Sequence, residues 1–231
     1  MSATPVGFFR ALTHRVTNLP FVRPMIERNR WLVAAYFDYR YLRPDPYAYD
    51  TSASERLRRE RVTAFLNDRQ YSDILEVGCG EGHMTGVLLP LGRTLTGIDI
   101  SKRAVRRARD RYRQHPQATF LATDVLTFRS PRRFDLITCS ETLYYLNLSQ
   151  IEEAARILAE HLAPGGRLLS VNIFASTEAS QGLELKATGA GTIHPLLQKV
   201  SGLRVVRTET YPDYEMMLLE KSPGPDGGPQ D

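Results

Sequence analysis

The stretch "DILEVGCGEGHMTGVL", residues 73–88, places three glycines at alternate positions between an apolar run and a helix-like segment. The apolar run favours a buried β-strand, and the residues from 82 to about 89 favour a helix. Glycine-rich loops at such junctions are typical of nucleotide binding, because a backbone without Cβ atoms can approach a ligand closely. The stretch therefore predicts a nucleotide-binding α/β fold and leaves the nucleotide open.

Strand-like and helix-like segments alternate after residue 70. The strand-like runs are "DILEV", "TLTGID", "ATFLATD", "FDLITCS" and "GRLLSVNIF". Helices are expected over 101–114 and 149–162, with N-caps at Ser101 and Ser149, a capping box completed by Glu152, and "APGG" as a stop signal. This alternation predicts a doubly wound, mostly parallel sheet. "LRVVRTETY" and "YEMMLLEK" flank Pro212 and Asp213, which predicts a final antiparallel hairpin.

Composition is that of a globular protein, with 231 residues, 42% hydrophobic and 24% charged. No apolar run reaches the roughly 18 residues needed to cross a bilayer, and we expect a cytoplasmic protein. Cys79 and Cys139 lack metal-ligand spacing and are expected to be buried thiols, without a bound metal. Residues 1–60 are expected to form a helical cap, 61–221 the core and 222–231 a disordered tail.

Arginine carries most of the net charge of +4, in the segments 54–69 and 101–115. Apolar residues recur in these segments at helical spacing, which predicts that the arginines lie on solvated helix faces. We therefore expect no nucleic-acid or membrane partner, and a monomer or homodimer. The apolar positions are Leu57, Val62, Phe65, Leu66, Ala104, Val105, Ala108 and Tyr112.

The loop pattern from Gly78 to Gly82, G-x-G-x-G, is neither a dinucleotide fingerprint nor a P-loop. Its acids, Glu76 and Glu81, would repel a polyphosphate, but they suit a nucleoside with a cationic end, such as S-adenosylmethionine. Asp99 ends the next strand, 17 residues after Gly82, where a carboxylate can accept hydrogen bonds from ribose hydroxyls. Asp124 ends the third strand and is expected near the adenine amino edge.

"LEVGCGEGHMT", "GIDIS", "ATDV", "FDLITCSETLYYL" and "LAPGGRLLS" occur in the order found in class I S-adenosylmethionine-dependent methyltransferases, and residues 70–175 resemble that family. "DPYAYDTSASER" followed by "SETLYYL" is similar to the subgroup of nodulation-factor N-methyltransferases, which act on a free amine of an amino sugar. The resemblance implies a Rossmann-like sheet of seven strands, with the last strand antiparallel and inserted beside the sixth.

The same resemblance implies the cofactor-binding residues. The methionine portion would meet the loop, the nucleoside would meet the next two strand ends, and Ser140 would lie under the sulfonium. Tyr47 stands where the subgroup has a tryptophan after "DP", and Arg56 could bind the cofactor carboxylate or the substrate, or be merely exposed. The full set is Glu76, Gly78, Cys79, Gly80, Gly82, Asp99, Ile100, Asp124, Val125, Ser140, Tyr47 and Arg56.

Glu141 and Tyr144 are the candidate catalytic residues, since "SETLYYL" directly follows the fourth strand. Glu141 can act as a general base for an amine or hydroxyl acceptor, or can be a helix-start acid stabilised by the helix dipole. One of Tyr144 and Tyr145 is expected in the core and the other in the pocket. His83 could touch the cofactor or lie at the surface, and His194 has no visible partner.

The sequence thus predicts methyl transfer to a small-molecule acceptor, most readily an amine of a sugar or secondary metabolite. O-methylation is the alternative, followed by an RNA or protein methyltransferase and a non-catalytic cofactor-binding protein. Base-amino methyltransferases would carry an Asn/Asp-Pro-Pro-aromatic motif where this chain has "SETL". Substrate contacts are expected from the cap and from the loop at 175–191.

Overall fold

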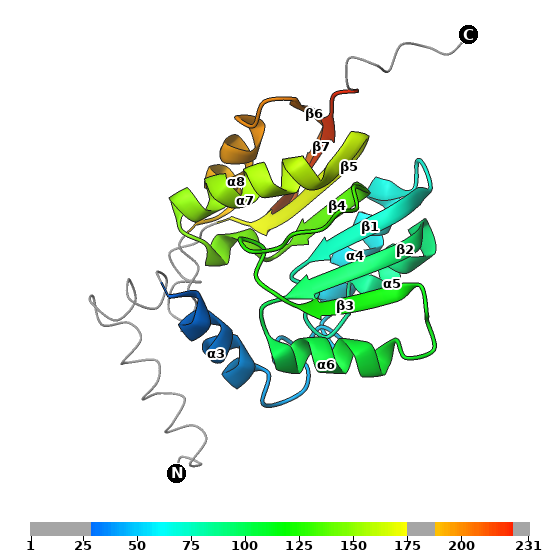
Figure 1. Ribbon diagram of the computed structural model, residues 1–231, viewed down its shortest axis with the longest axis vertical. Helices are drawn as coiled ribbons and strands as arrows, with labels where there is room; N and C mark the ends of the chain where they lie inside the picture. The colour runs from blue at the N-terminus through cyan, green and yellow to red at the C-terminus, as the bar shows by residue number, and fades with distance from the viewer. Residues whose placement is uncertain (1–28, 175–187, 224–231) are drawn as a thin grey trace.

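The computed structural model describes residues 29–174 and 188–223 (Figure 1). Expectations for residues 1–28, for most of the substrate loop at 175–191 and for the tail at 224–231 therefore lie outside the described residues. Within the described part, no helix has the length and apolar character needed to cross a membrane.

The centre of the fold is a seven-stranded sheet in the order β3-β2-β1-β4-β5-β7-β6. Pairing is parallel from β3 to β5, whereas β7 runs antiparallel between β5 and β6, as predicted. The chain order reverses at β1, whose neighbours are β2 and β4, and ligands of such sheets bind at the carboxyl ends of the strands beside this point. The strands are β1 Tyr71–Val77, β2 Gly92–Asp99, β3 Ala118–Ala122, β4 Phe134–Ser140, β5 Leu162–Ile173, β6 Leu203–Thr210 and β7 Tyr214–Lys221.

Helices cover both faces of the sheet because the central strands are apolar on both sides. Ile74 and Leu136 face a core shared with α4, α5 and α6, whereas Leu75 and Ile137 face a core shared with α7 and α8. The helices are α3 Arg30–Arg40, α4 Ala53–Leu66, α5 Thr85–Leu88, α6 Lys102–Arg111, α7 Leu148–His161 and α8 Ala190–Gln198, with short 3-10 turns η1 Leu89–Leu91 and η2 Leu143–Tyr145.

Of the two predicted helix N-caps, one is confirmed and one is wrong. Ser101 caps α6 as expected, with its side chain accepting a hydrogen bond from Ala104 N at 3.2 Å. The predicted cap of α7 is wrong by two residues: Asn147 is the N-cap, and it forms a capping box with Gln150. Ser149 instead donates its hydroxyl to Asn147 Oδ1 from within the first turn.

Two other boundaries also moved. The "APGG" segment at 163–166 does not end α7 but lies within β5, which begins at Leu162 directly after the last residue of α7, His161. The helix expected over 82–89 has only the short α5 followed by η1.

Helix α3, in the described part of the cap, lies beside α6 at the edge of the sheet to which the parallel strands point (Figure 1). Val33, Phe37 and Tyr41 of the α3 segment pack against Ala104. Asp38 of α3 accepts hydrogen bonds from Ser101 Oγ at 2.7 Å and from Arg103 N at 3.0 Å, which ties α3 to the start of α6. Helix α4 runs continuously across the expected boundary at residue 60. Residues 30–49 thus line the cavity at the carboxyl ends of the strands.

Candidate active site

Two adjoining cavities lie at the carboxyl ends of the central strands. The first encloses about 710 Å³ including its mouth, and Asp99, Asp124 and the cap residue Tyr47 are among its lining residues. The second encloses about 510 Å³ and is lined by the glycine loop and by α4. Gly78, Ser140 and Glu141 line both, together with Tyr41, Tyr49 and Val77, so the cavities meet at the ends of β1 and β4.

The glycine loop requires glycine at Gly78. Its φ is +75°, and a Cβ there would lie 1.9 Å from Thr142 Oγ1, a distance that no packing adjustment of a few tenths of an ångström can relieve. Gly80 lines the second cavity. Gly82, predicted to contact the cofactor, lines neither cavity; its carbonyl accepts a hydrogen bond from the Tyr112 hydroxyl at 2.8 Å. Its role is the packing of the loop on α6.

Asp99 lies in the first cavity, as predicted from its position at the end of β2. Its carboxylate accepts hydrogen bonds from Gly80 N at 3.0 Å and from Ser101 N at 2.8 Å. Burial raises the pKa of Asp99 to about 6, against the opposing effect of these two donors. Asp99 is therefore a carboxylate fixed in orientation by the glycine loop itself, and Ile100 lines the cavity beside it.

Glu76 and Cys79 line the second cavity from the end of β1 and the loop. Glu76 is 3% exposed and accepts a hydrogen bond from Thr85 Oγ1 at 2.5 Å. Burial raises the pKa of Glu76 to about 8, because little compensates for the desolvated charge. Burial also raises the pKa of the Cys79 thiol well above its usual value, so Cys79 is not an activated nucleophile.

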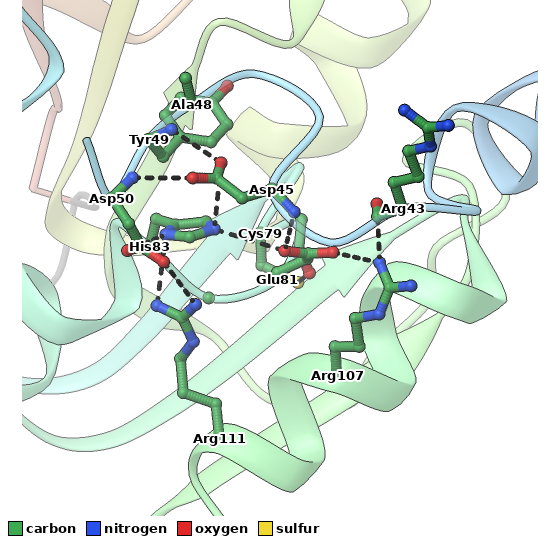
Figure 2. Close-up of polar contacts among 12 residues, drawn as sticks. Arg43, Asp45, Ala48, Tyr49, Asp50, Cys79, Glu81, His83, Arg107 and Arg111 are labelled. Atoms are coloured by element: carbon green, nitrogen blue, oxygen red, sulfur yellow. Dashed lines mark hydrogen bonds and ion pairs between the residues drawn. The ribbon is translucent and has the colours of Figure 1, made fainter. Parts of the chain in front are cut away.

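Glu81 corrects part of the electrostatic argument made from the sequence. It was expected to direct negative charge at the ligand, but its carboxylate accepts from Arg107 Nη1 at 2.5 Å and from Asp45 N at 2.9 Å (Figure 2). Arg107 also donates to the carbonyl oxygens of Leu42 and Arg43. The charge of Glu81 is balanced by α6, and its function in the structure is to hold the cap.

His83 belongs to the same group of contacts, which we call the cap latch: Asp45, Asp50, Glu81, His83, Arg107 and Arg111. Its Nδ1 lies 3.0 Å from Asp50 Oδ1, and Arg111 donates to the Asp50 carboxylate at 3.3 Å (Figure 2). Asp45 accepts from the backbone N–H groups of Tyr49 and Asp50, which shapes the turn that carries Tyr47 and Tyr49. The cap latch thus connects the glycine loop and α6 to the cap residues that line the cavities.

Asp124 and Val125 line the far end of the first cavity. One carboxylate oxygen of Asp124, Oδ1, accepts from Leu126 N at 3.1 Å, and the other, Oδ2, accepts from Arg30 Nε at 2.5 Å. Arg30 could not be singled out from the sequence, because no motif marks a residue of the cap that reaches the third strand.

Glu141 stands where the two cavities meet. It has a φ of +56° and its carboxylate accepts from Ile173 N at 2.9 Å and from the Tyr144 hydroxyl at 3.0 Å. No α-helix begins there, since the three-residue turn η2 follows, so the helix-start alternative does not apply. The Arg58 guanidinium lies 4.0 Å from the carboxylate. Glu141 is therefore a fixed carboxylate between strand ends.

One of the two tyrosines lies in the core and the other in the cavity, as expected, but the core residue is Tyr144, the one predicted to be catalytic. Tyr144 is 3% exposed and packs in the core behind Glu141, and burial raises the pKa of its hydroxyl well above the usual value. Tyr145 lines the first cavity and packs edge-to-face against Phe37 of α3. Tyr144 thus contacts Glu141 rather than the cavity, and its place in the structure is that of a positioning residue.

Arg58, not Arg56, reaches the site. Arg56 is exposed and lines neither cavity, and Leu57, expected on the apolar face, is 44% exposed. Arg58 lies one helical turn before Val62 on the buried face of α4. Its guanidinium donates to Glu55 at 2.8 Å and lies 4.8 Å from the centre of the Tyr214 ring. An arginine was expected here, but the phase of the helix selects a different one.

His194 lies outside both cavities but does have partners. Its Nδ1 is 2.7 Å from Glu215 Oε1, and its Nε2 is 3.3 Å from Asn172 Nδ2. Burial lowers the pKa of His194, which favours the neutral ring. The contacts join α8 to β5 and β7.

A family model described as "Nodulation protein S (NodS)" matches residues 38–208. The chain belongs to the NodS family. The similarity to nodulation-factor N-methyltransferases inferred from "DPYAYDTSASER" and "SETLYYL" is thereby confirmed, and so is the Rossmann-like fold.

Individual NodS relatives cover different shares of the chain. Nodulation protein S of Sinorhizobium fredii is 35% identical over 127 residues, which make up 54% of this chain and 59% of that protein. The chain thus spans somewhat less than two thirds of this curated relative. The crystal structure of N-methyltransferase NodS from Bradyrhizobium japonicum WM9, in complex with S-adenosyl-L-homocysteine, matches with a TM-score of 0.71 and 28% identity, covering 81% of this chain and 97% of that one.

A ubiquinone biosynthesis O-methyltransferase of Albidiferax ferrireducens is also similar, with 30% identity over 97 residues. The match covers 40% of this chain and 38% of that protein.

Proposed function

We propose that the protein transfers a methyl group from S-adenosylmethionine to an amine of a small molecule, with an amino sugar as the first candidate. The observation that carries this proposal is Glu141, a fixed carboxylate at the junction of the two cavities. A carboxylate at this place attracts an ammonium group and can take its proton, which an amine must lose before it can attack a methyl group.

The lining residues fit S-adenosylmethionine, which supplies an activated methyl group on a sulfonium. Asp99 can accept hydrogen bonds from the ribose, and the loop around Gly78 allows close approach of the backbone. Glu76 offers an acid to the α-ammonium group. The complex of the Bradyrhizobium japonicum relative with S-adenosyl-L-homocysteine supports the same assignment.

Arg58 suits the α-carboxylate of the cofactor better than Arg56 does. It lines the second cavity, and its Nε is buried with no acceptor among residues 29–174 and 188–223. Because a guanidinium remains charged and offers only donors, a ligand carboxylate would satisfy this atom.

On the acceptor side, the protein supplies position, a proton acceptor and exclusion of water. Tyr47 and Tyr145 line the first cavity from the cap and from η2, and Phe37 packs behind Tyr145. Holding nucleophile and methyl group in line is worth on the order of 7–11 kcal/mol of the barrier. Hydrogen bonds from Ile173 N and the Tyr144 hydroxyl keep Glu141 in one orientation. The carboxylate that takes the proton is therefore in place before the substrate amine binds.

A hydroxyl acceptor is the second candidate, favoured by the similarity to the ubiquinone biosynthesis O-methyltransferase. Glu141 would then serve as the base that a hydroxyl requires. The two candidates differ in charge, because an amine arrives as a cation and a phenol or sugar hydroxyl arrives neutral.

A methyl-transfer assay with S-adenosylmethionine labelled in its methyl group tests the proposal. The acceptors are a chitooligosaccharide with one free amine, its fully N-acetylated counterpart and a catechol. We expect label on the free-amine oligosaccharide and none on the acetylated one, which is the matched control. Label on the catechol alone would favour the hydroxyl candidate, and no transfer to any acceptor, despite cofactor binding, would contradict a sugar or catechol substrate.

A further inference from the structure

Arg30 brings a cation from the cap to the nucleoside end of the first cavity. It is the first residue of α3 and lines the cavity together with Asp124 and Val125. Its Nε donates to Asp124 Oδ2 at 2.5 Å, and the two side chains are only 24% and 9% exposed. The contact joins residues 94 positions apart, so it places α3 against the third strand end.

One nitrogen of the Arg30 guanidinium, Nη1, is a buried donor without an acceptor among the described residues. Among residues 29–174 and 188–223, no group accepts a hydrogen bond from Arg30 Nη1, although this atom is buried. A buried N–H without an acceptor is unfavourable, and arginine cannot avoid the cost by losing its proton. A donor of this kind in a cavity wall indicates a ligand that supplies an acceptor.

Asp124 is less available than its position in the sequence suggests. Oδ1 already accepts from Leu126 N and Oδ2 from Arg30. From its place at the strand end, the carboxylate of Asp124 or the neighbouring amide was expected to meet the adenine amino edge, whose amino group is a donor. The unsatisfied atom at this end of the cavity is instead a donor, and it matches the ring nitrogens of adenine, which accept.

We infer that Arg30 is a cofactor-contacting residue that donates from Nη1 to a ring nitrogen of the adenine, while its Nε remains on Asp124. This inference rests on the proposed cofactor. It makes recognition of the base depend on the cap, because the donor that binds the base, Arg30 Nη1, belongs to α3 rather than to the sheet. An ATP-like or NAD-like ligand carries the same base, so the contact selects for adenine and not for the methionine end.

A double-mutant cycle between Arg30 and the base tests the inference. The ligands are S-adenosylhomocysteine and three analogues, each with one acceptor nitrogen of the ring (N1, N3 or N7) replaced by C–H. The proteins are the wild type, Arg30→Met and the matched control Arg106→Met, which removes an exposed arginine of α6. Affinities come from calorimetric titration, and thermal melting verifies folding.

We expect Arg30→Met to weaken S-adenosylhomocysteine binding by about 10-fold to 150-fold, the effect of losing one charged hydrogen bond, and Arg106→Met to leave it unchanged. One analogue should bind the wild type more weakly by a similar factor, yet bind Arg30→Met as well as S-adenosylhomocysteine does. If the loss of affinity caused by Arg30→Met and the loss caused by each analogue were independent, so that the two factors multiplied in the combined measurement, the ring contact would belong to another donor and the inference would be overturned. So would equal binding of all four ligands to the wild type, a result that does not depend on any variant folding. If the wild type bound none of the four, the proposed function itself would fail.

Discussion

Binding of S-adenosylhomocysteine should release a proton from Glu76. Burial raises the pKa of this carboxyl to about 8, so at pH 7 about nine in ten unliganded molecules carry the protonated acid. An α-ammonium group beside Glu76 favours the carboxylate and should return that pKa toward the ordinary value of 4.5, well below 7. The expected release is therefore about 0.9 proton per site at pH 7 and about 0.1 at pH 9. Asp99, whose pKa is about 6, adds about 0.1 at pH 7.

Calorimetric titration at pH 7 in two buffers of different ionisation enthalpy measures this proton number. Glu76→Gln is the control, since an amide can still accept from Thr85 but does not titrate. Its proton release should fall to the small contribution of Asp99. Equal release by wild type and variant would refute the reasoning, because the proton would then come from the ligand or from another group.

The raised pKa of Glu76 also makes the free energy of unfolding depend on pH. Its pKa is higher in the folded state than the ordinary value of 4.5, so the folded state holds more protons between pH 4.5 and about 8. The unliganded protein should lose a few kcal/mol of stability as the pH rises through this window, and Glu76→Gln should flatten the loss. Denaturant titration of both proteins across this range would contradict the linkage if the two curves ran parallel.

Other residues of the site give separate expectations. Asp99→Ala should weaken cofactor binding by about 1.5–3 kcal/mol for each charged hydrogen bond lost, with the fold intact by circular dichroism. Wild-type affinity in this variant would show that the ribose does not bind at Asp99. Glu141→Gln should lower the single-turnover rate by about 10²–10⁴ with cofactor affinity almost unchanged, and a cationic amine should also bind more weakly; wild-type rates would leave the reaction to positioning alone. Glu81→Gln should weaken the cap latch, so amide hydrogen exchange over residues 42–50 should speed up and its protection by S-adenosylhomocysteine should shrink. Unchanged exchange there would make the latch a static contact.

Local patterns predicted the features that depend on local geometry. The glycine at position 78 could be assigned because only a residue without Cβ fits its positive φ beside Thr142. The end of β2 placed Asp99 correctly, since parallel strands bring their carboxyl ends to one edge. The place of the antiparallel last strand followed from the resemblance to a known family, and the alternation of strand-like and helix-like segments predicted the mostly parallel sheet.

Features that depend on how the cap docks could not be predicted this way. Arg56 and Arg58 are two positions apart, and only the packing of α4 shows which one faces the cavity. Glu81 looked like a ligand-facing acid because its partner Arg107 is 26 residues away in the sequence. Arg30 meets Asp124 through a docking of α3 on the sheet edge that no spacing rule encodes.

Calorimetric titration of the wild-type protein with S-adenosylhomocysteine, and separately with NAD, tests the central claim most directly. Glu76, which can lose its proton to an α-ammonium group, and the fixed Asp99 predict one micromolar site for S-adenosylhomocysteine and far weaker binding of NAD, whose pyrophosphate gains no charge partner from these acids. Tight binding of NAD with no heat from S-adenosylhomocysteine would contradict the account.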